Sequence, residues 1–164
     1  MLEHHQPFPM LIIDRYYRVV EVNAAGAALL TMAGVESERG TNVTWALFTA
    51  EAQRLVSNWD VVAGHLLRRI QREVLTQPAD TEMAELLDHL LATATVPEAW
   101  RIPDLAHTND PMVDMHVDLG EVTLKMLTTI THLSAPNDVT LQELQIESYI
   151  PVDQVTRDFF EAMA

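Results

Sequence analysis

The sequence predicts an α+β domain in which a five-stranded antiparallel sheet carries a helical layer on one face. Two observations support this prediction. Segments near both ends of the chain are rich in β-branched and aromatic residues, whereas the middle shows the apolar period of amphipathic helices. Strands from the two ends most simply join one sheet, and the helices between them then cover one of its faces.

The first strands are expected in residues 10–22, which read MLIIDRYYRVVEV. Two apolar runs flank Asp14 and Arg15, a pattern that predicts a hairpin with its turn at this dipeptide. Asn23 follows directly and is a candidate N-cap for a short helix of small residues. Gly34 marks the expected end of that helix, because glycine readily adopts the left-handed conformation of a helix terminus.

The clearest helical pattern lies in residues 51–75. Ser57 and Asp60 have the spacing of a capping box, and Pro78 marks the end of the helix. Apolar residues recur at intervals of three and four, which predicts a single stripe facing the sheet. The stripe consists of Trp59, Val62, Ala63, Leu66, Leu67, Ile70 and Val74. Asp80 is the expected cap of a second amphipathic helix.

From Met112 onward the apolar period changes from 3.6 to 2, which predicts a hairpin with its turn at Gly120. A last strand is expected within residues 139–150, with its apolar side toward the helices. That side comprises Leu144, Ile146 and Ile150. Residues 151–164 predict a short C-terminal helix that packs on the domain or on a partner.

The composition excludes several classes of function. The 164 residues carry a formal net charge of −14, a field that repels nucleic acids and anionic membranes. The absence of cysteine excludes disulfides, thiolate metal sites and cysteine nucleophiles. No run approaches the ~20 apolar residues of a membrane span, so we expect a cytoplasmic protein.

Landmark residues in three segments resemble those of the ligand-binding domain of the MmyB-like transcription regulators, a PAS-like sensor. In the first hairpin and the helix after it they are Asp14, Arg15, Tyr17, Val20, Asn23 and Ala25. In the middle of the chain they are Asn42, Phe48, Arg54, Leu55, Asn58, Trp59 and Ala63. In the later hairpin they are His116, Gly120, Thr123 and Leu124.

This resemblance implies a PAS-like ligand-binding domain over residues 7–150 that binds a small apolar effector, with long-chain fatty acids as the leading candidates. Family members usually carry a helix-turn-helix headpiece, and we expect no DNA-binding domain in this chain, so that DNA is reached only through a separate part. No cofactor other than the effector and no metal is expected. Val117 stands where the family has a proline after the histidine.

The candidate ligand-binding residues combine the helix stripe with nearby aromatic and sheet residues, and either of two arginines could hold an acid group through a forked contact. They are Trp45, Phe48, Arg54, Asn58, Trp59, Val62, Leu66, Arg69, Ile70, Trp100, Met115, Leu124 and Met126. For any one apolar member, plain core packing remains an alternative.

Two other functions remain open at this point. One is a small-molecule enzyme that uses the same pocket, with His116 and the neighbouring Asp114 and Asp118 as acid and base. The other is an interaction module with a solid core and no ligand. Independently of the function, Phe159 and Phe160 predict a dimer contact through the terminal helix, because adjacent residues of a helix cannot both face one core.

Overall fold

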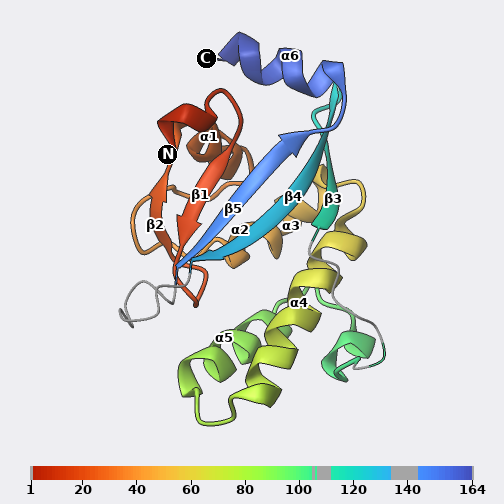
Figure 1. Cartoon of the computed structure of the whole chain (residues 1–164). Coiled ribbons are helices and arrows are strands. Elements are labelled where there is room, and N and C mark those ends of the chain that lie inside the picture. Colours follow the sequence, from red (N-terminus) through yellow and green to blue (C-terminus); the bar gives the residue numbers. More distant parts are fainter. Residues whose placement is uncertain (1, 105, 107–111, 134–143, 164) are drawn as a thin grey trace.

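A computed structural model describes residues 2–104, 106, 112–133 and 144–163 (Figure 1). Its centre is a five-stranded sheet in the order β2-β1-β5-β4-β3, in which all neighbouring strands are antiparallel. The strands are β1 (Met10–Ile13), β2 (Val19–Val22), β3 (Met112–Asp118), β4 (Thr123–Leu133) and β5 (Leu144–Pro151). The predicted α+β fold with a five-stranded antiparallel sheet is confirmed, and its PAS-like arrangement places strands from both chain ends side by side.

The helices are η1 (Glu3–His5), α1 (Ala24–Met32), α2 (Thr44–Leu47), α3 (Ala50–Leu55), α4 (Trp59–Thr76), α5 (Thr81–Leu91), η2 (Glu98–Arg101) and α6 (Gln154–Met163). In the view of Figure 1, α2 and α3 lie behind the sheet, and α4 and α5 extend beyond its lower end. Helix α6 crosses the opposite end. The predicted helical layer is therefore continued by a helical pair that reaches past the sheet.

Asn23 fastens the first hairpin to helix α1. Its Oδ1 accepts a hydrogen bond from the Gly26 amide at 2.8 Å, the N-cap contact that the sequence predicted. The same atom accepts from the Met10 amide at 3.1 Å, and Nδ2 donates to the Phe8 carbonyl. Gly34, with φ of 76°, follows the end of the helix as predicted. One side chain thus caps α1 and holds it on β1.

Helix α4 begins differently from the prediction, because no capping box forms between Ser57 and Asp60. The helix starts at Trp59, and the Asn58 side chain makes no cap contact. Instead, Asn58 Oδ1 accepts from the His116 amide at 3.0 Å and Nδ2 donates to the Asp114 carbonyl at 2.8 Å. The unpaired backbone groups of edge strand β3 compete for this side chain. The start of α4 is consequently tied to the sheet.

The apolar stripe of α4 has two sides rather than one, which corrects the prediction. Residues Trp59, Ala63, Leu67 and Ile70 are buried, in a core cluster that also includes Met83, Leu86 and Leu90 of α5. Helix α5, capped by Asp80 as predicted, folds back along α4 and packs on this side. Val62, Leu66 and Arg69 form the other side, which faces the cavity described below.

The side of strand β5 that faces the helices is the opposite of the predicted one. Ile146 forms a small second cluster with Leu2 and Met10, on the face away from the helices. Leu144 shares that face because side chains alternate along a strand. Glu147 and Tyr149 point to the helix side instead. The N-terminal segment covers part of the outer face, so an apolar side of β5 is buried there without contacting any helix of the layer.

The predicted C-terminal helix is present as α6 and packs on β4 and β5 of the same chain. The Lys125 amide donates to Thr156 Oγ1 at 2.8 Å, and Phe160 is 1% exposed. Residues 139–143 of the predicted last strand lie outside the described residues. Among the residues that are described, no helix has the length and apolar character needed to cross a membrane.

Candidate functional site

A cavity of about 330 Å³ lies between helices α1–α4 and the helix-facing side of the sheet. Its apolar lining comes from every one of these helices and from strands β3 and β4. This lining includes Leu29, Leu30, Val43, Leu47, Leu55, Val56, Val62, Leu66, Val113, Met115, Val117 and Ile130. A hollow of this size between tightly packed layers is unusual for a plain core, where voids rarely exceed one water molecule.

Four of the predicted ligand-binding residues line this cavity, and they come from α4 and β3. They are Val62, Leu66, Arg69 and Met115. Leu124 and Met126 lie on the same face of β4 as the cavity wall, but both are fully buried outside it. Side chains at that end of the sheet pack together and leave no open space.

Most of the predicted aromatic residues lie in the solid core beside the cavity. Trp59 stacks on Trp100 with ring centroids 5.4 Å apart and meets Phe48 edge-on at 6.1 Å. Its Nε1 also donates to the Leu47 carbonyl at 2.7 Å. Ile70 is likewise buried in this core. These residues support the cavity wall from behind instead of lining it.

Arg54, Trp45 and Asn58 lie outside the cavity. The Arg54 side chain is 72% exposed and pairs with Glu51 one helical turn away, so its predicted approach to an acid group in the cavity does not occur in this structure. Trp45 is half exposed, with its ring near His89. Of the two candidate arginines, only Arg69 lines the cavity.

Arg69 is held by a ring of polar and aromatic groups. Its Nη2 donates to Gln145 Oε1 at 2.8 Å, and its Nε approaches Glu73 Oε1 at 3.4 Å. Nη2 also lies 3.3 Å from His132 Nε2, and the guanidinium stands over the Tyr17 ring. Nη1 takes part in none of these contacts. The guanidinium is thus held in place at the edge of the cavity by groups from α4, β4, β5 and the first hairpin.

Glu147 and Tyr149 form a polar pair on the β5 floor of the cavity. The Tyr149 hydroxyl donates to Glu147 Oε2 at 3.1 Å. Burial raises the pKa of Glu147, while the hydrogen bond from Tyr149 and the charge of Arg69 act in the opposite direction. Burial likewise raises the pKa of Glu73 and, with the charge of Arg69, lowers that of His132. Burial therefore disfavours the charged forms of Glu147, Glu73 and His132.

Two hydroxyl groups on the cavity wall are buried without a hydrogen-bond partner in the structure. They belong to Tyr17, which is 1% exposed, and to Thr128 on β4. An unpaired buried hydroxyl costs free energy, so native proteins usually satisfy it with another group or a bound molecule. Both residues line the cavity, but their hydroxyl oxygens are closed off from water in the structure.

The family model for the MmyB-like transcription regulator ligand binding domain matches residues 1–163. The chain belongs to this family. The match includes the C-terminal helix α6 and the N-terminal turn as well as residues 7–150, in which the sequence placed the domain. No curated protein matches the chain. The protein is thus a ligand-binding domain of an MmyB-like regulator, a family assignment that agrees with a cavity at its centre.

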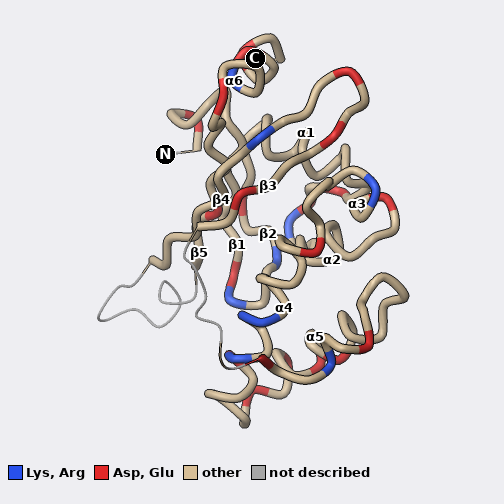
Figure 2. The backbone as a smooth tube through the Cα atoms, turned by 90° about the vertical axis from the view of Figure 1, so that its right-hand side faces the viewer, with Lys and Arg blue, Asp and Glu red and all other residues tan. Residues whose placement is uncertain are grey.

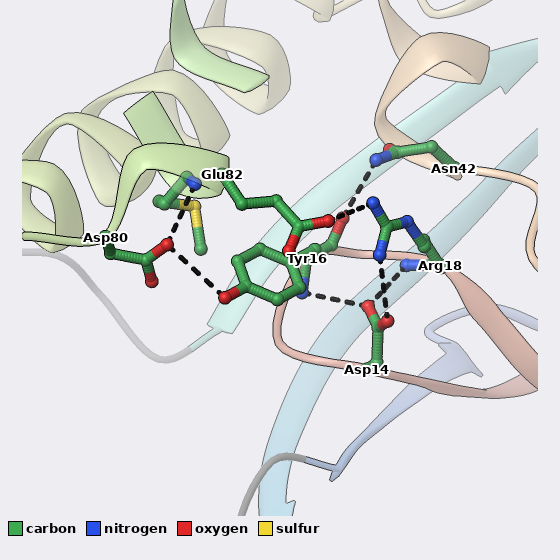
Figure 3. Close-up of polar contacts among 7 residues, drawn as sticks. Asp14, Tyr16, Arg18, Asn42, Asp80 and Glu82 are labelled. Atoms are coloured by element: carbon green, nitrogen blue, oxygen red, sulfur yellow. Dashed lines mark hydrogen bonds and ion pairs between the residues drawn. The ribbon is translucent and has the colours of Figure 1, made fainter. Parts of the chain in front are cut away.

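Landmark residues of the MmyB-like domain shape the turn around Tyr17, which lines the cavity. Figure 3 shows Asp14, Tyr16 and Arg18 of this turn together with Asn42. The Asp14 carboxylate accepts hydrogen bonds from the Tyr16 and Arg18 amides at 2.8 and 2.9 Å. Asn42 Nδ2 donates to the Tyr16 carbonyl at 2.8 Å. These contacts hold Tyr17 at φ of 64°, a left-handed backbone position that aromatic residues rarely adopt.

The same turn is fastened to the loop between α4 and α5. Arg15 forms an ion pair with the Asp80 carboxylate. The Tyr16 hydroxyl also donates to Asp80, and Arg18 pairs with Glu82 (Figure 3). Asp80 also caps α5 through the Met83 amide. Figure 2 shows blue basic segments on α4 within a backbone marked by many acidic residues. Arg15 and Arg18 therefore join the first hairpin to the start of α5.

The histidine predicted as an acid or base lies away from the cavity. His116 alternates with Met115 and Val117, which line the cavity, so its side chain leaves the opposite face of β3. Asp114 and Asp118 share that outer face. Within the described part of the chain, no three His, Asp or Glu side chains are grouped closely enough to hold a metal ion.

Several cavity residues were not predicted from the sequence. Leu29 and Leu30 belong to a helix whose small residues indicated only tight packing. Glu147 and Tyr149 were not considered, because the apolar side of β5 was expected to face inward. The alternation along β4 was the available signal: Thr128, Ile130 and His132 continue the face of Leu124 and Met126.

Proposed function

We propose that the domain binds a long-chain fatty acid, or an effector with a similar apolar tail and acid group, in the cavity between helices and sheet. The observation that supports this proposal is the cavity itself. Its volume of about 330 Å³ falls within the range of small-molecule sites, and most of its lining is apolar. Binding would control transcription through the DNA-binding part of the regulator.

The lining is sufficient to hold an acyl chain. Burial of about a dozen methylenes at ~0.8 kcal/mol each gives a gross gain on the order of 10 kcal/mol. Lost translational freedom and ordering of the flexible chain offset a large part of this gain. The expected affinity is therefore roughly micromolar, which suits an effector whose concentration changes in the cell.

Arg69 is the proposed partner of the acid group. Its side chain is only 14% exposed, and its contacts with Gln145 and Glu73 use Nη2 and Nε, which leaves Nη1 for a ligand oxygen. Burial raises the pKa of both Glu73 and Glu147, whereas the charge of Arg69 acts in the opposite direction. A charge-assisted hydrogen bond here would compensate the cost of burying the ligand carboxylate.

Regulation would follow from a shift between packing arrangements of the helices on the sheet. A ligand changes such an equilibrium only by binding one arrangement better than the other. Residues of α1 to α4 all contribute to the cavity wall, so occupation favours the arrangement in which these helices surround the ligand. A neighbouring domain or protomer would detect this change at the surface.

The two other functions predicted from the sequence have less support. The enzyme hypothesis relied on His116, which lies on the strand face opposite the cavity-lining residues. The hypothesis of a solid interaction module does not account for the open volume behind Leu66 and Met115. The cavity therefore favours effector binding over both.

Native mass spectrometry of the freshly purified protein, followed by lipid extraction, tests the proposal. We expect an adduct with the mass of a long-chain fatty acid, and a rise in melting temperature when oleic acid is added to delipidated protein. Val62→Trp, which fills the cavity, should abolish the rise, whereas Val61→Trp on the 53% exposed neighbouring position should preserve it. An empty protein that no saturated or unsaturated long-chain acid stabilises would refute the proposal.

A further inference from the structure

Arg69 and the backbone bridge between Val56 and Val117 lie at opposite ends of strand β4. Arg69 contacts His132, the last residue but one of the strand. Val117 is paired with Leu124, the second residue of β4, and forms the bridge with Val56, which follows α3. Leu124 and His132 are separated by roughly 27 Å at the rise of an antiparallel strand. Because Arg69, Val56 and Val117 all line one cavity, this cavity extends along β4.

The two ends of the cavity differ in polarity and in access to solvent. The polar side chains of His132 and Glu147 lie near Arg69, and His132 is exposed. The opposite end is formed by apolar side chains, of which Val56 is 7% and Val117 5% exposed. An acyl chain with its acid group at Arg69 therefore extends toward a closed, apolar end.

This closed end is held by hydrogen bonds of the backbone. The Val56 amide donates to the Ala52 carbonyl at 2.8 Å, and the Val56 carbonyl accepts from the Trp59 amide at 3.0 Å. The bridge to Val117 ties the same residue to β3. Well-packed interiors accept additional atoms only at a cost in strain. The wall formed by these two valines therefore yields little to a chain that is too long.

We propose that Val56 and Val117 form an end stop for the acyl chain and thereby determine which chain lengths the domain binds. This inference rests on the proposed binding of fatty acids in the cavity and names residues that determine its specificity. Each methylene up to the stop adds buried apolar surface and tightens binding by up to about fourfold. A longer chain must bend or move its acid group away from Arg69. Affinity therefore passes through a maximum as the chain lengthens.

A series of saturated acids from octanoic to icosanoic acid tests the inference on the delipidated protein. Titration calorimetry should show an affinity that rises with chain length, reaches a maximum and then falls. Val56→Phe enlarges the stop and should move the maximum to acids about four carbons shorter, because the ring takes the space of that many chain carbons. Val56→Ala enlarges the cavity and should move the maximum to acids about two carbons longer. Val117→Ala should act in the same direction.

The matched controls are Val61→Phe and Val61→Ala, because Val61 is 53% exposed on α4 and lies outside the cavity. Both should keep the maximum of the unmodified protein. Cooperative thermal unfolding shows whether each variant is folded. If Val56→Phe does not fold, the test relies on Val56→Ala, which needs no additional space.

The possible outcomes separate this inference from the proposed function. If fatty acids bind but the folded Val56 variants keep the maximum of the unmodified protein, the inference is wrong and the proposed function stands. The same conclusion follows if affinity rises steadily up to the longest acid. If no acid of the series binds to the unmodified protein, the proposed function fails, and the inference fails with it.

Discussion

The guanidinium carbon of Arg69 lies 5.6 Å from the centroid of the Tyr17 ring, a contact that joins helix α4 to the first hairpin across one end of the cavity. The backbone of Tyr17 is fixed by its own amide, which donates to Asp14, and by its carbonyl, which accepts from Val43. Such a contact restricts both side chains before any ligand arrives. The proposed acid-binding position is therefore preorganised.

Replacement of Arg69 by Gln should weaken fatty-acid binding by about tenfold to a hundredfold, because the ligand carboxylate loses a charge-assisted hydrogen bond in a poorly solvated site. Arg54→Gln is the control, since Arg54 is exposed and lies outside the cavity. Calorimetric titration with oleic acid checks both variants. Equal affinities of the two variants would remove Arg69 from the proposed site.

Tyr17→Phe should stabilise the ligand-free protein by about 1 kcal/mol, because it removes a buried hydroxyl that has no partner while the ring is kept. Urea denaturation of delipidated protein measures the free energy of unfolding. If the hydroxyl serves a ligand, the same variant should bind oleic acid more weakly. A variant less stable than the parent would show that the hydroxyl is already satisfied in solution, for example by water.

Loss of the Asp80 carboxylate should destabilise the fold. Asp80→Ala removes the cap of α5 and the contacts with Arg15 and Tyr16, and we expect a cost of about 2 kcal/mol in the free energy of unfolding. Glu82→Ala breaks only the exposed pair with Arg18 and should cost less than about 0.5 kcal/mol. Urea denaturation of the two variants compares them directly, and equal costs would show that the Asp80 contacts contribute little.

The ligand-free protein should lose stability as the pH rises above the ordinary carboxyl value of 4.5, through a contribution from Glu147. Burial raises the pKa of this group in the folded state, so between the unfolded and folded pKa values the native state binds more protons. In that interval the free energy of unfolding falls with increasing pH. The contribution is fully present only below the unfolded value.

Glu147→Gln should remove this part of the pH dependence, because glutamine does not titrate. Melting temperatures of the parent and the variant, measured at intervals from about pH 4 to pH 8, should diverge in favour of the variant as the pH increases. Glu51→Gln, at an exposed position, provides the comparison. Parallel curves for Glu147→Gln and the parent would contradict the predicted effect of burial.

Local patterns were enough to predict most of the fold. Features that depend on residues near in sequence can be recognised from short motifs. Such features are the caps Asn23 and Asp80, the end of α1 at Gly34 and the change of period at Met112. The capping box at Ser57 failed because the Ser57 amide and hydroxyl both donate to the His116 carbonyl of the distant strand β3. Such a competition is invisible to a local pattern.

The candidate site was harder to predict, since a cavity depends on how elements are placed and not on their periodicity. An apolar stripe on α4 indicated burial, but it did not indicate that α5 would occupy one half of it and leave the other half to the cavity. Glu147 was missed for a related reason. Its neighbour Ile146 is more apolar and was therefore expected to face the helices. Ile146 is instead buried on the outer face of β5, which the N-terminal segment partly covers.

Helix α4 is anchored at both of its ends. Asn58 holds its start to β3, and the Arg15 contact with Asp80 holds the loop at its end to the turn between β1 and β2. The two contacts involve opposite sides of the sheet, edge strand β3 at the start of the helix and the turn before edge strand β2 at its end. A ligand that contacts Leu66 in the cavity therefore touches a helix whose two ends are both tied to the sheet. Movement of α4 on ligand binding would therefore have to change the contacts of Asn58 or Asp80.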